Sequence, residues 1–247
     1  MCTLALEFAP DTALPLLVAA NRDEALDRPA TGPALREGPI RFLAPRDEKA
    51  GGTWLGLNAR GLFVGITNRF GQRPDPNRLS RGALVWESLA QPSADALHRA
   101  LSTLDVRRYN PFHLLYADRS GAFATWSDGG ARRQVQLQPG LHVVTERSFD
   151  AVPVVEREGL LRDAWTRANV HASADLERLH DVMTLHDPET RIGGTCVHAE
   201  ELNYGTRSSL LLALAREPRQ SRFMWAEGRP CEHPHVDEPE LLRALGI

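Results

Sequence analysis

Two apolar runs open the chain, TLALEF at 3–8 and LPLLVAA at 14–20, and the turn residues Pro10 and Asp11 lie between them. Short apolar runs bounded by turn residues are typical of buried strands. The pattern therefore predicts a β-hairpin. The polar sequence NRDE at 21–24 is expected in the loop after its second strand.

Further strands are predicted where apolar runs alternate with Gly-rich turns. The segment 53–71 predicts two strands around the turn NARG at 58–61, and 112–145 predicts a meander of four strands. The runs at 208–215 and 222–228 predict a closing hairpin. In contrast, Pro and Gly interrupt 28–40, which is therefore interpreted as a loop.

Helical spacing of apolar residues recurs in five places. The N-cap residues Ser80 and Ser93 precede two of these segments, and Ser173 precedes another. The predicted helices are 81–90, 94–104, 155–169, 174–186 and 238–245.

The order of strands, helices, strands, helices and strands indicates an α+β fold rather than a regular βαβ alternation. Two packed sheets with helices outside them would bury the continuous apolar strands on both faces. Hydrophobic residues make up 42% of the chain and charged residues 25%, which are ordinary values for a globular protein. We expect a single domain over 1–247.

Charge and cysteine content narrow the class of protein. The formal net charge is −3 and no basic stripe is present, which argues against nucleic acid or an anionic membrane as the main partner. No apolar run approaches the roughly 20 residues of a membrane span.

Glu7 and Asp11 precede the apolar run at 13–21, which excludes the basic start of a secretory signal. Three cysteines do not form a disulfide framework, so we expect a reducing, cytoplasmic location.

Cys2 follows the initiator methionine directly. Removal of Met1 would leave a thiol and a free α-amine on one residue, and their pKa values are close enough for proton transfer between them. A nucleophile at an amino terminus carries its own general base. The simpler interpretation is a chance cysteine on an edge strand.

The antiparallel hairpin places residue 2 beside residues 21–23. NRDE offers an amide, a guanidinium and two carboxylates there. These groups predict a polar site around Cys2, with a solvated turn as the alternative.

Seven blocks follow one another in order from Met1 to about Ser209: MCTLAL, AANRDE, RDEKAGGTWLGLNARGLFVGITNR, SRGALV, YNPFHLLYAD, PGLHVVT and YGTRSS. These blocks resemble the NRDE-motif family, also called the transport and Golgi organisation protein 2 family. The family is grouped with the N-terminal nucleophile hydrolases, so the resemblance implies their four-layer αββα sandwich.

The resemblance also implies roles for particular residues. MCTLALEF, LNARGLFVGITN and TRSS are similar to bile salt hydrolases and penicillin V acylases, whose opening cysteine attacks an amide. The resemblance implies that Cys2 is the nucleophile and that Asp23 holds the α-amine of Cys2. It also implies that Asn68 contributes to the oxyanion hole and that Arg207 lies near the nucleophile. Asn21, Arg22, Trp54 and Glu146 are candidate binding or supporting residues.

Two positions depart from the acylase pattern. Ala20 stands where the acylases have an arginine, and Arg22 supplies the arginine instead. Glu146 stands where they have an asparagine after the late threonine of a strand. A carboxylate there would repel an oxyanion, and we expect it to form an ion pair with Arg22 or Arg207.

Two functions are therefore kept open. The first is a cysteine amidohydrolase acting on a small acylated amine, with positive charge lowering the pKa of Cys2. The second is a non-catalytic binder or carrier of a hydrophobic metabolite, since the NRDE family is linked to haem trafficking and to lipid or acyl-coenzyme A handling. The oligomeric state is left open.

Cysteine and histidine also gather near the end of the chain. Cys196 and His198 form one group, and Cys231, His233 and His235 form another. Neither group has the usual spacing of a zinc site, so the expectation is exposed loop residues, no metal and no cofactor. An axial haem ligand is an alternative for the same histidines. GG at 51–52 lacks the residues of a phosphate-binding loop and is interpreted as close backbone packing between strands.

Overall fold

The computed structural model describes residues 2–71, 73–149, 156–170 and 175–247. The chain forms two compact units. The first contains Met1–Arg28 and Gly140–Pro239, and the second contains Pro29–Pro139 and Glu240–Ile247.

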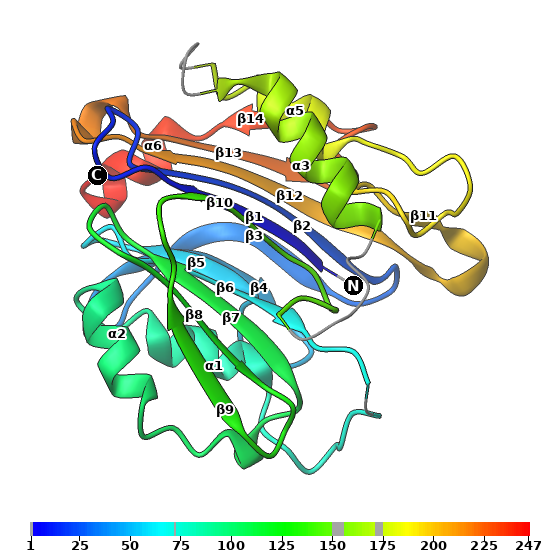
Figure 1. The fold of residues 1–247 in the computed structure, drawn as a ribbon, viewed down its shortest axis with the longest axis horizontal. Helices are drawn as coiled ribbons and strands as arrows, with labels where there is room; N and C mark the ends of the chain where they lie inside the picture. Colours follow the sequence, from blue (N-terminus) through cyan, green and yellow to red (C-terminus); the bar gives the residue numbers. More distant parts are fainter. Residues whose placement is uncertain (1, 72, 150–155, 171–174) are drawn as a thin grey trace. The chain divides into compact units, whose positions relative to one another are not determined.

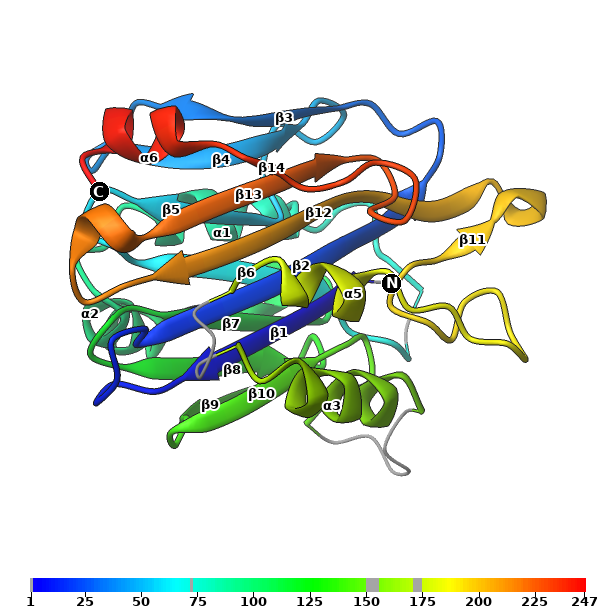
Figure 2. The same ribbon diagram turned by 90° about the horizontal axis from the view of Figure 1, so that it is seen from above.

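The first unit is built on an antiparallel sheet with the order β10-β1-β2-β12-β13-β14, and β11 pairs with β12. Figure 2 shows β1, β2, β12 and β13 running side by side. Its strands are β1 (Cys2–Phe8), β2 (Leu16–Ala25), β10 (Gly140–Val144), β11 (His198–Ala199), β12 (Tyr204–Leu214), β13 (Arg222–Glu227) and β14 (Val236–Asp237).

Helices α3 (Glu156–Ala168) and α5 (Arg178–Met183) lie along one face of this sheet (Figure 1). Leu161 and Trp165 of α3 and Leu179 of α5 pack against Ala19 of β2 and Leu211 of β12 in one buried cluster. The Trp165 indole also donates a hydrogen bond to Glu7 at 2.6 Å. Burial of the apolar helix face therefore fixes both helices on the sheet.

The second unit is built on an antiparallel sheet in which each strand pairs with the next along the chain, β3-β4-β5-β6-β7-β8-β9. Helix α6 (Pro239–Leu245) belongs to this unit, and Ala244 accepts a hydrogen bond from Arg41. The strands are β3 (Ala30–Arg36), β4 (Phe42–Asp47), β5 (Leu55–Asn58), β6 (Phe63–Asn68), β7 (Phe112–Ala117), β8 (Ala122–Ser127) and β9 (Arg132–Gln136).

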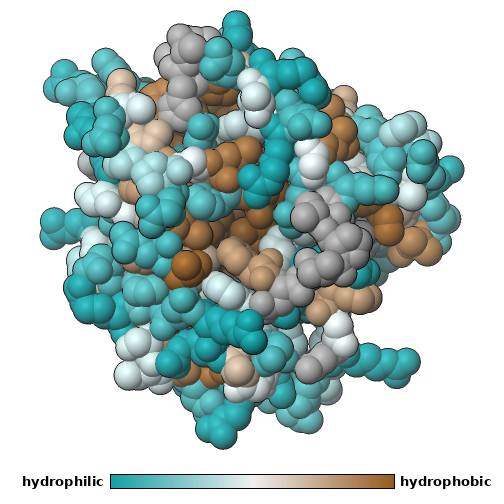
Figure 3. Space-filling view, viewed as in Figure 1, coloured by the Kyte–Doolittle hydropathy of each residue, from teal (hydrophilic) through white to brown (hydrophobic). Residues whose placement is uncertain are grey.

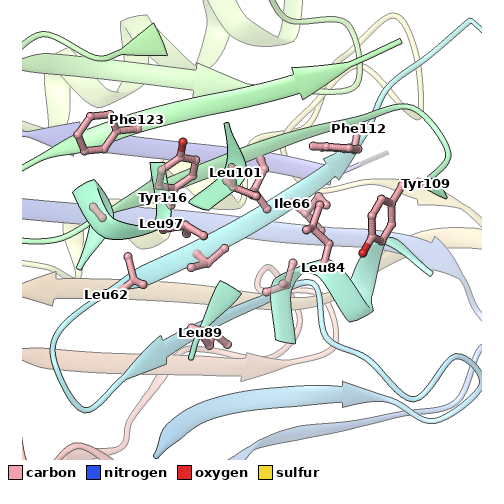
Figure 4. Close-up of a cluster of buried hydrophobic side chains, with 14 of the residues drawn as sticks. Leu62, Ile66, Leu84, Leu89, Leu97, Leu101, Tyr109, Phe112, Tyr116 and Phe123 are labelled. Atoms are coloured by element: carbon pink, nitrogen blue, oxygen red, sulfur yellow. The ribbon is translucent and has the colours of Figure 1, made fainter. Parts of the chain in front are cut away.

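Helices α1 (Arg81–Ser88) and α2 (Ala94–Leu101) pack on the second sheet through apolar side chains (Figure 4). Ser80 and Ser93 cap them by accepting hydrogen bonds from Gly82 and Ala96, as predicted. The packing brings Gly52 against Gly82, where an added Cβ on Gly52 would lie 2.4 Å from the Gly82 carbonyl carbon. The expected close packing of 51–52 between strands is wrong: Gly52 packs against the backbone of α1, and an added Cβ on Gly51 would meet no atom within 4 Å.

Three further expectations from the sequence are wrong. NRDE is not in a loop, because β2 continues through it to Ala25. The interrupted segment 28–40 contains β3, which pairs with β4 around an irregularity between Thr31 and Ala34. The expected meander divides: three of its strands stay in the second sheet, whereas β10 pairs with β1. The predicted cap Ser173 lies outside the described residues.

Hydrophilic residues predominate on the face shown in Figure 3. Within the described ranges, no helix is long and apolar enough to cross a membrane. The large apolar side chains that are exposed come from separate segments: Phe70, Leu79, Val135, Phe149, Ile192, Leu202 and Val236.

Candidate functional site

Cys2 begins β1 and pairs across the hairpin with Arg22 of β2. This confirms that residue 2 is a neighbour of residues 21–23. The thiol is half-buried, and it donates a long hydrogen bond of 3.9 Å to the carbonyl oxygen of Asp23. The fold thus places the cysteine against the polar end of β2.

Asp23 is buried, with only 3% of its surface exposed. Its Oδ1 accepts a hydrogen bond of 2.7 Å from the hydroxyl of Thr206, and its Oδ2 lies 3.6 Å from Arg157 Nη1. The pKa of Asp23 is raised to about 6, mainly by burial and to a smaller extent by the negative charge of Glu146. Arg157 and Thr206 oppose that rise by stabilising the carboxylate.

Arg157 is a site residue that the sequence analysis missed. It lies in the first turn of α3, is 2% exposed, and contacts Thr3 and the carbonyl oxygen of Ile192 as well as Asp23. Its spacing from Leu161 and Trp165 is that of one helix face, and this face is buried. An arginine at that spacing was the signal in the sequence that could have found it.

Side chains alternate along β2, so NRDE presents two faces. Asn21 and Asp23 share one face. The Asn21 amide donates to the carbonyl oxygens of Met183 and Thr195 at 2.9 and 2.7 Å. Asn21 therefore ties β2 to the end of α5 and to the segment that follows it.

Arg22 lies on the other face, the face of its register partner Cys2. Its positive charge lowers the pKa of Cys2, but burial has the larger effect and raises it. The expectation of a Cys2 pKa below its free value applies to the chain without Met1, and for that form it stays a prediction. Ala20 and Arg22 are two residues apart on β2, so their side chains point to the same face of the sheet. Arg22 therefore lies on the face where the acylases have their arginine.

Glu146 follows β10 and is 6% exposed. Its Oε1 lies 3.8 Å from Nε of its neighbour Arg147. Among the described residues the expected ion pair with Arg22 or Arg207 does not form: Glu146 pairs with Arg147, and Arg22 pairs with Glu24 at 3.9 Å. The side chain of Arg207 donates to the carbonyl oxygen of Leu26.

Arg207 occupies an irregularity in the pairing of β12 with β2, between Thr206 and Ser208. Its side chain lines a groove of about 410 Å³ together with Glu227, Gly228 and Arg229. Its proximity to the nucleophile stays a prediction.

Asn68 and Trp54 belong to the second unit. Asn68 is the last residue of β6 and is exposed. Trp54 is partly buried and packs against the core of that unit, and its role as a binding or supporting residue stays a prediction. The approach of Asn68 to Cys2 stays a prediction.

Comparisons with known proteins agree with this arrangement. The family model "Transport and Golgi organisation 2" matches residues 1–227. The chain belongs to this family. The Transport and Golgi organization protein 2 homolog of Bos taurus is 31% identical over 153 residues, which are 58% of this chain and 55% of the bovine protein. The match thus spans about half the length of the curated relatives.

Solved acylase structures share the fold. A C2A mutant of conjugated bile acid hydrolase from Clostridium perfringens covers 97% of this chain and 93% of its own, with a TM-score of 0.57 and 13% identity. Penicillin V acylase from Agrobacterium tumefaciens covers 92% of this chain and 83% of its own, with a TM-score of 0.50 and 16% identity. The predicted αββα fold of N-terminal nucleophile hydrolases is thereby confirmed.

The raised pKa of Asp23 predicts a pH-dependent stability. Its pKa in the fold, about 6, exceeds the ordinary 3.8, so the folded state binds the proton more tightly than the unfolded state. Tighter proton binding stabilises the folded state fully at a pH below 3.8, the pKa of Asp23 in the unfolded chain. This contribution to the free energy of unfolding is lost as the pH rises through about 6, and the loss is on the order of 3 kcal/mol. Urea unfolding of the parent and of Asp23→Asn across this range measures it. A stability difference independent of pH would contradict the prediction.

Glu146→Gln is expected to lower the pKa of Asp23, because the charge of Glu146 raises it. Little stability should be lost, since Arg147 is 46% exposed and water can replace the carboxylate as its partner. The urea series described for Asp23 tests both effects when it is repeated on this variant. An unchanged pH dependence would show that Glu146 does not act on Asp23.

Proposed function

We propose that this chain is a cysteine amidohydrolase that acts on a small acylated amine, with Cys2 as the nucleophile after removal of Met1. The observation that carries the proposal is the pairing of Cys2 with the buried end of β2, where Asp23 is held by Thr206 and Arg157. An ordinary strand end would not bury an aspartate and two arginines.

The proposed reaction starts with transfer of the Cys2 thiol proton to its own α-amine, which Asp23 holds in place. The thiolate attacks the substrate carbonyl carbon, and the side-chain amide of Asn68 with a backbone N–H stabilises the oxyanion. The C–N bond then breaks, the amine leaves with the proton, and an acyl thioester remains on Cys2. Water hydrolyses this thioester, releasing the acid and restoring the thiol.

A panel of acyl-amines and β-lactam amides tests the proposal, read together with the intact mass of the purified protein. The expected result is loss of the Met1 mass and turnover of at least one amide. A chain that retains Met1, or one that lacks Met1 and turns over none of the panel, would count against the hydrolase.

A second candidate is a non-catalytic binder of a hydrophobic metabolite on the same scaffold. It is favoured by the raised pKa of Cys2, because a protonated thiol is a poor nucleophile. The two candidates differ in what removal of Met1 does to Cys2.

Removal of Met1 is expected to increase the alkylation rate of Cys2 under a limiting dose of iodoacetamide near neutral pH. The freed α-amine can accept the thiol proton, whereas an amine acylated by Met1 cannot. Cys196 should react slowest of the three cysteines, because it is buried and only 2% of its surface is exposed to the reagent. Peptide mapping of the trimmed and untrimmed forms measures the rates. Equal Cys2 rates in the two forms would favour the binder.

A further inference from the structure

Four potential metal ligands meet at one point of the first unit. Cys196 and His186 come from the segment between α5 and β11, His198 begins β11, and Cys231 lies between β13 and β14. Their ligand atoms all lie within 4.8 Å of one another. No metal-ligand spacing in the sequence links Cys231 to the other three residues, so only the fold assembles this set.

We propose that His186, Cys196, His198 and Cys231 form a structural zinc site. The two sulfur atoms are 3.4 Å apart, and Nε2 of His198 lies 3.1 Å from the Cys231 sulfur and 3.8 Å from the Cys196 sulfur. Tetrahedral Zn–S and Zn–N bonds place such atoms about 3.3–3.8 Å apart. The sulfur–sulfur distance and the His198–Cys196 distance lie in that range, and the His198–Cys231 distance is slightly shorter. Two thiols and two imidazoles are the donor set that selects Zn²⁺ over harder cations.

Groups behind the ligands orient His198 toward this point. Its Nδ1 lies 3.7 Å from Glu200 and 3.8 Å from Glu232, which leaves Nε2 facing the sulfur atoms. Arg229 pairs with these two carboxylates at 2.5 and 3.2 Å. Carboxylates behind a ligating histidine support its metal bond, and at 3.7 and 3.8 Å these two act on His198 as negative charges rather than as hydrogen-bond acceptors.

The backbone that carries Cys196 is built for close approach to His186. The Cys196 N–H donates to the carbonyl oxygen of Leu185 at 3.0 Å. Gly194 makes this possible, because a Cβ there would lie 2.4 Å from that oxygen and 2.8 Å from the His186 Cα. Cys196 is 2% exposed. His198 is half-buried, and His186 and Cys231 are exposed. The backbone thus fixes the buried ligand Cys196 close to His186, at a point that a metal ion could reach from solvent.

A disulfide between Cys196 and Cys231 is the competing interpretation of the short sulfur distance. It would give no role to His198, which faces the two sulfur atoms, or to His186, whose ring centroid lies 4.8 Å from that of His198. A metal ion uses all four groups. His233 and His235 are not part of the set, and His235 instead meets His180 at 3.0 Å and Ser209 at 2.8 Å.

The proposed zinc would also brace the surroundings of Asp23. Val197, between the ligands Cys196 and His198, donates its N–H to the Thr206 hydroxyl oxygen at 2.8 Å. That hydroxyl donates to Asp23 at 2.7 Å. Zinc thus fixes the segment that positions Thr206. This inference does not depend on the proposed hydrolysis.

The test is zinc binding by the full chain, reduced and stripped with a chelator. Competition against a chromophoric chelator should give one zinc per chain. Cobalt in place of zinc should show the visible bands of a tetrahedral site and a thiolate-to-cobalt charge-transfer band. Cys196→Ser and Cys231→Ser should lose the charge-transfer intensity, and Glu232→Gln should weaken affinity by about 10–100-fold. His233→Ala, two residues from Cys231, and Cys2→Ser should bind zinc like the parent.

Three results would overturn the proposal: no stoichiometric zinc on the reduced parent, equal binding by the double variant Cys196→Ser/Cys231→Ser, or an octahedral cobalt spectrum without thiolate bands. Glu232→Gln removes no ligand, so it remains informative if a cysteine variant fails to fold. Protection of Cys196 and Cys231 from iodoacetamide by zinc, with Cys2 still labelled, would support the site independently. Failure of amide turnover would not bear on any of these readouts.

Discussion

Arg157→Met is expected to lower the free energy of unfolding by about 3–5 kcal/mol at neutral pH, because it leaves the Asp23 carboxylate buried without its cation. Both partners of this ion pair are buried: the side chain of Arg157 is 3% exposed and that of Asp23 is 0% exposed. Methionine keeps most of the length and the apolar contacts of the arginine, so the loss reports mainly on charge and hydrogen bonding. Urea unfolding measures it.

The cost of this substitution should shrink on acidification. The pKa of Asp23 is already raised to about 6, and removing Arg157 removes a group that lowers it. Below that pH the carboxyl group is neutral and no longer needs a cation. Arg162→Met is the matched control: Arg162 lies on the same helix, but it is exposed and donates to the carbonyl oxygen of Leu141. It should change stability by less than about 1 kcal/mol. Equal losses of unfolding free energy in the two variants would show that the buried ion pair between Asp23 and Arg157 does not stabilise the fold.

The parts of the fold that were predicted from the sequence depend on local patterns. Ser80 and Ser93 cap helices because each is followed by helical spacing of apolar residues. The hairpin of β1 and β2 was predicted because apolar runs flank a turn. Both signals involve residues close in sequence, and both were confirmed.

The errors come from pairings between distant segments. NRDE was placed in a loop because four polar residues normally mark a surface turn. In the fold these residues are buried and find partners far along the chain, with Asn21 bonded to Thr195 and Asp23 to Thr206. The pairing of β10 with β1 was missed for the same reason, since periodicity identifies a strand but not its neighbour.

The candidate site was predicted in part. The resemblance to a known family named Cys2 and Asp23 as candidates, and the hairpin explains why they are neighbours. Arg157 required the tertiary structure, because only the docking of α3 on the sheet brings its guanidinium to Asp23. His186 and Cys231 likewise meet only after β12 and β13 are in place.

Cys2→Ala is expected to abolish amide turnover, with a loss of about 10⁴–10⁶-fold, the range seen when a covalent nucleophile is removed. No other described thiol can replace it, because Cys196 and Cys231 lie at the cluster with His198 rather than beside Arg22. The fold should persist, since Cys2 is half-buried and its one hydrogen bond is long.

Two readouts separate loss of the nucleophile from loss of structure. Intact mass after incubation with an activated acyl donor should show one acyl group, mapped to Cys2 in the parent and absent from Cys2→Ala. Asn68→Ala should still be acylated but turn over about 10²–10³-fold more slowly, because it removes only an oxyanion donor. His233→Ala, outside the proposed catalytic residues, should keep parental turnover. Undiminished turnover by Cys2→Ala would refute the assignment of the nucleophile, because the thiol whose place in the hairpin carries the proposal would then have no part in the chemistry.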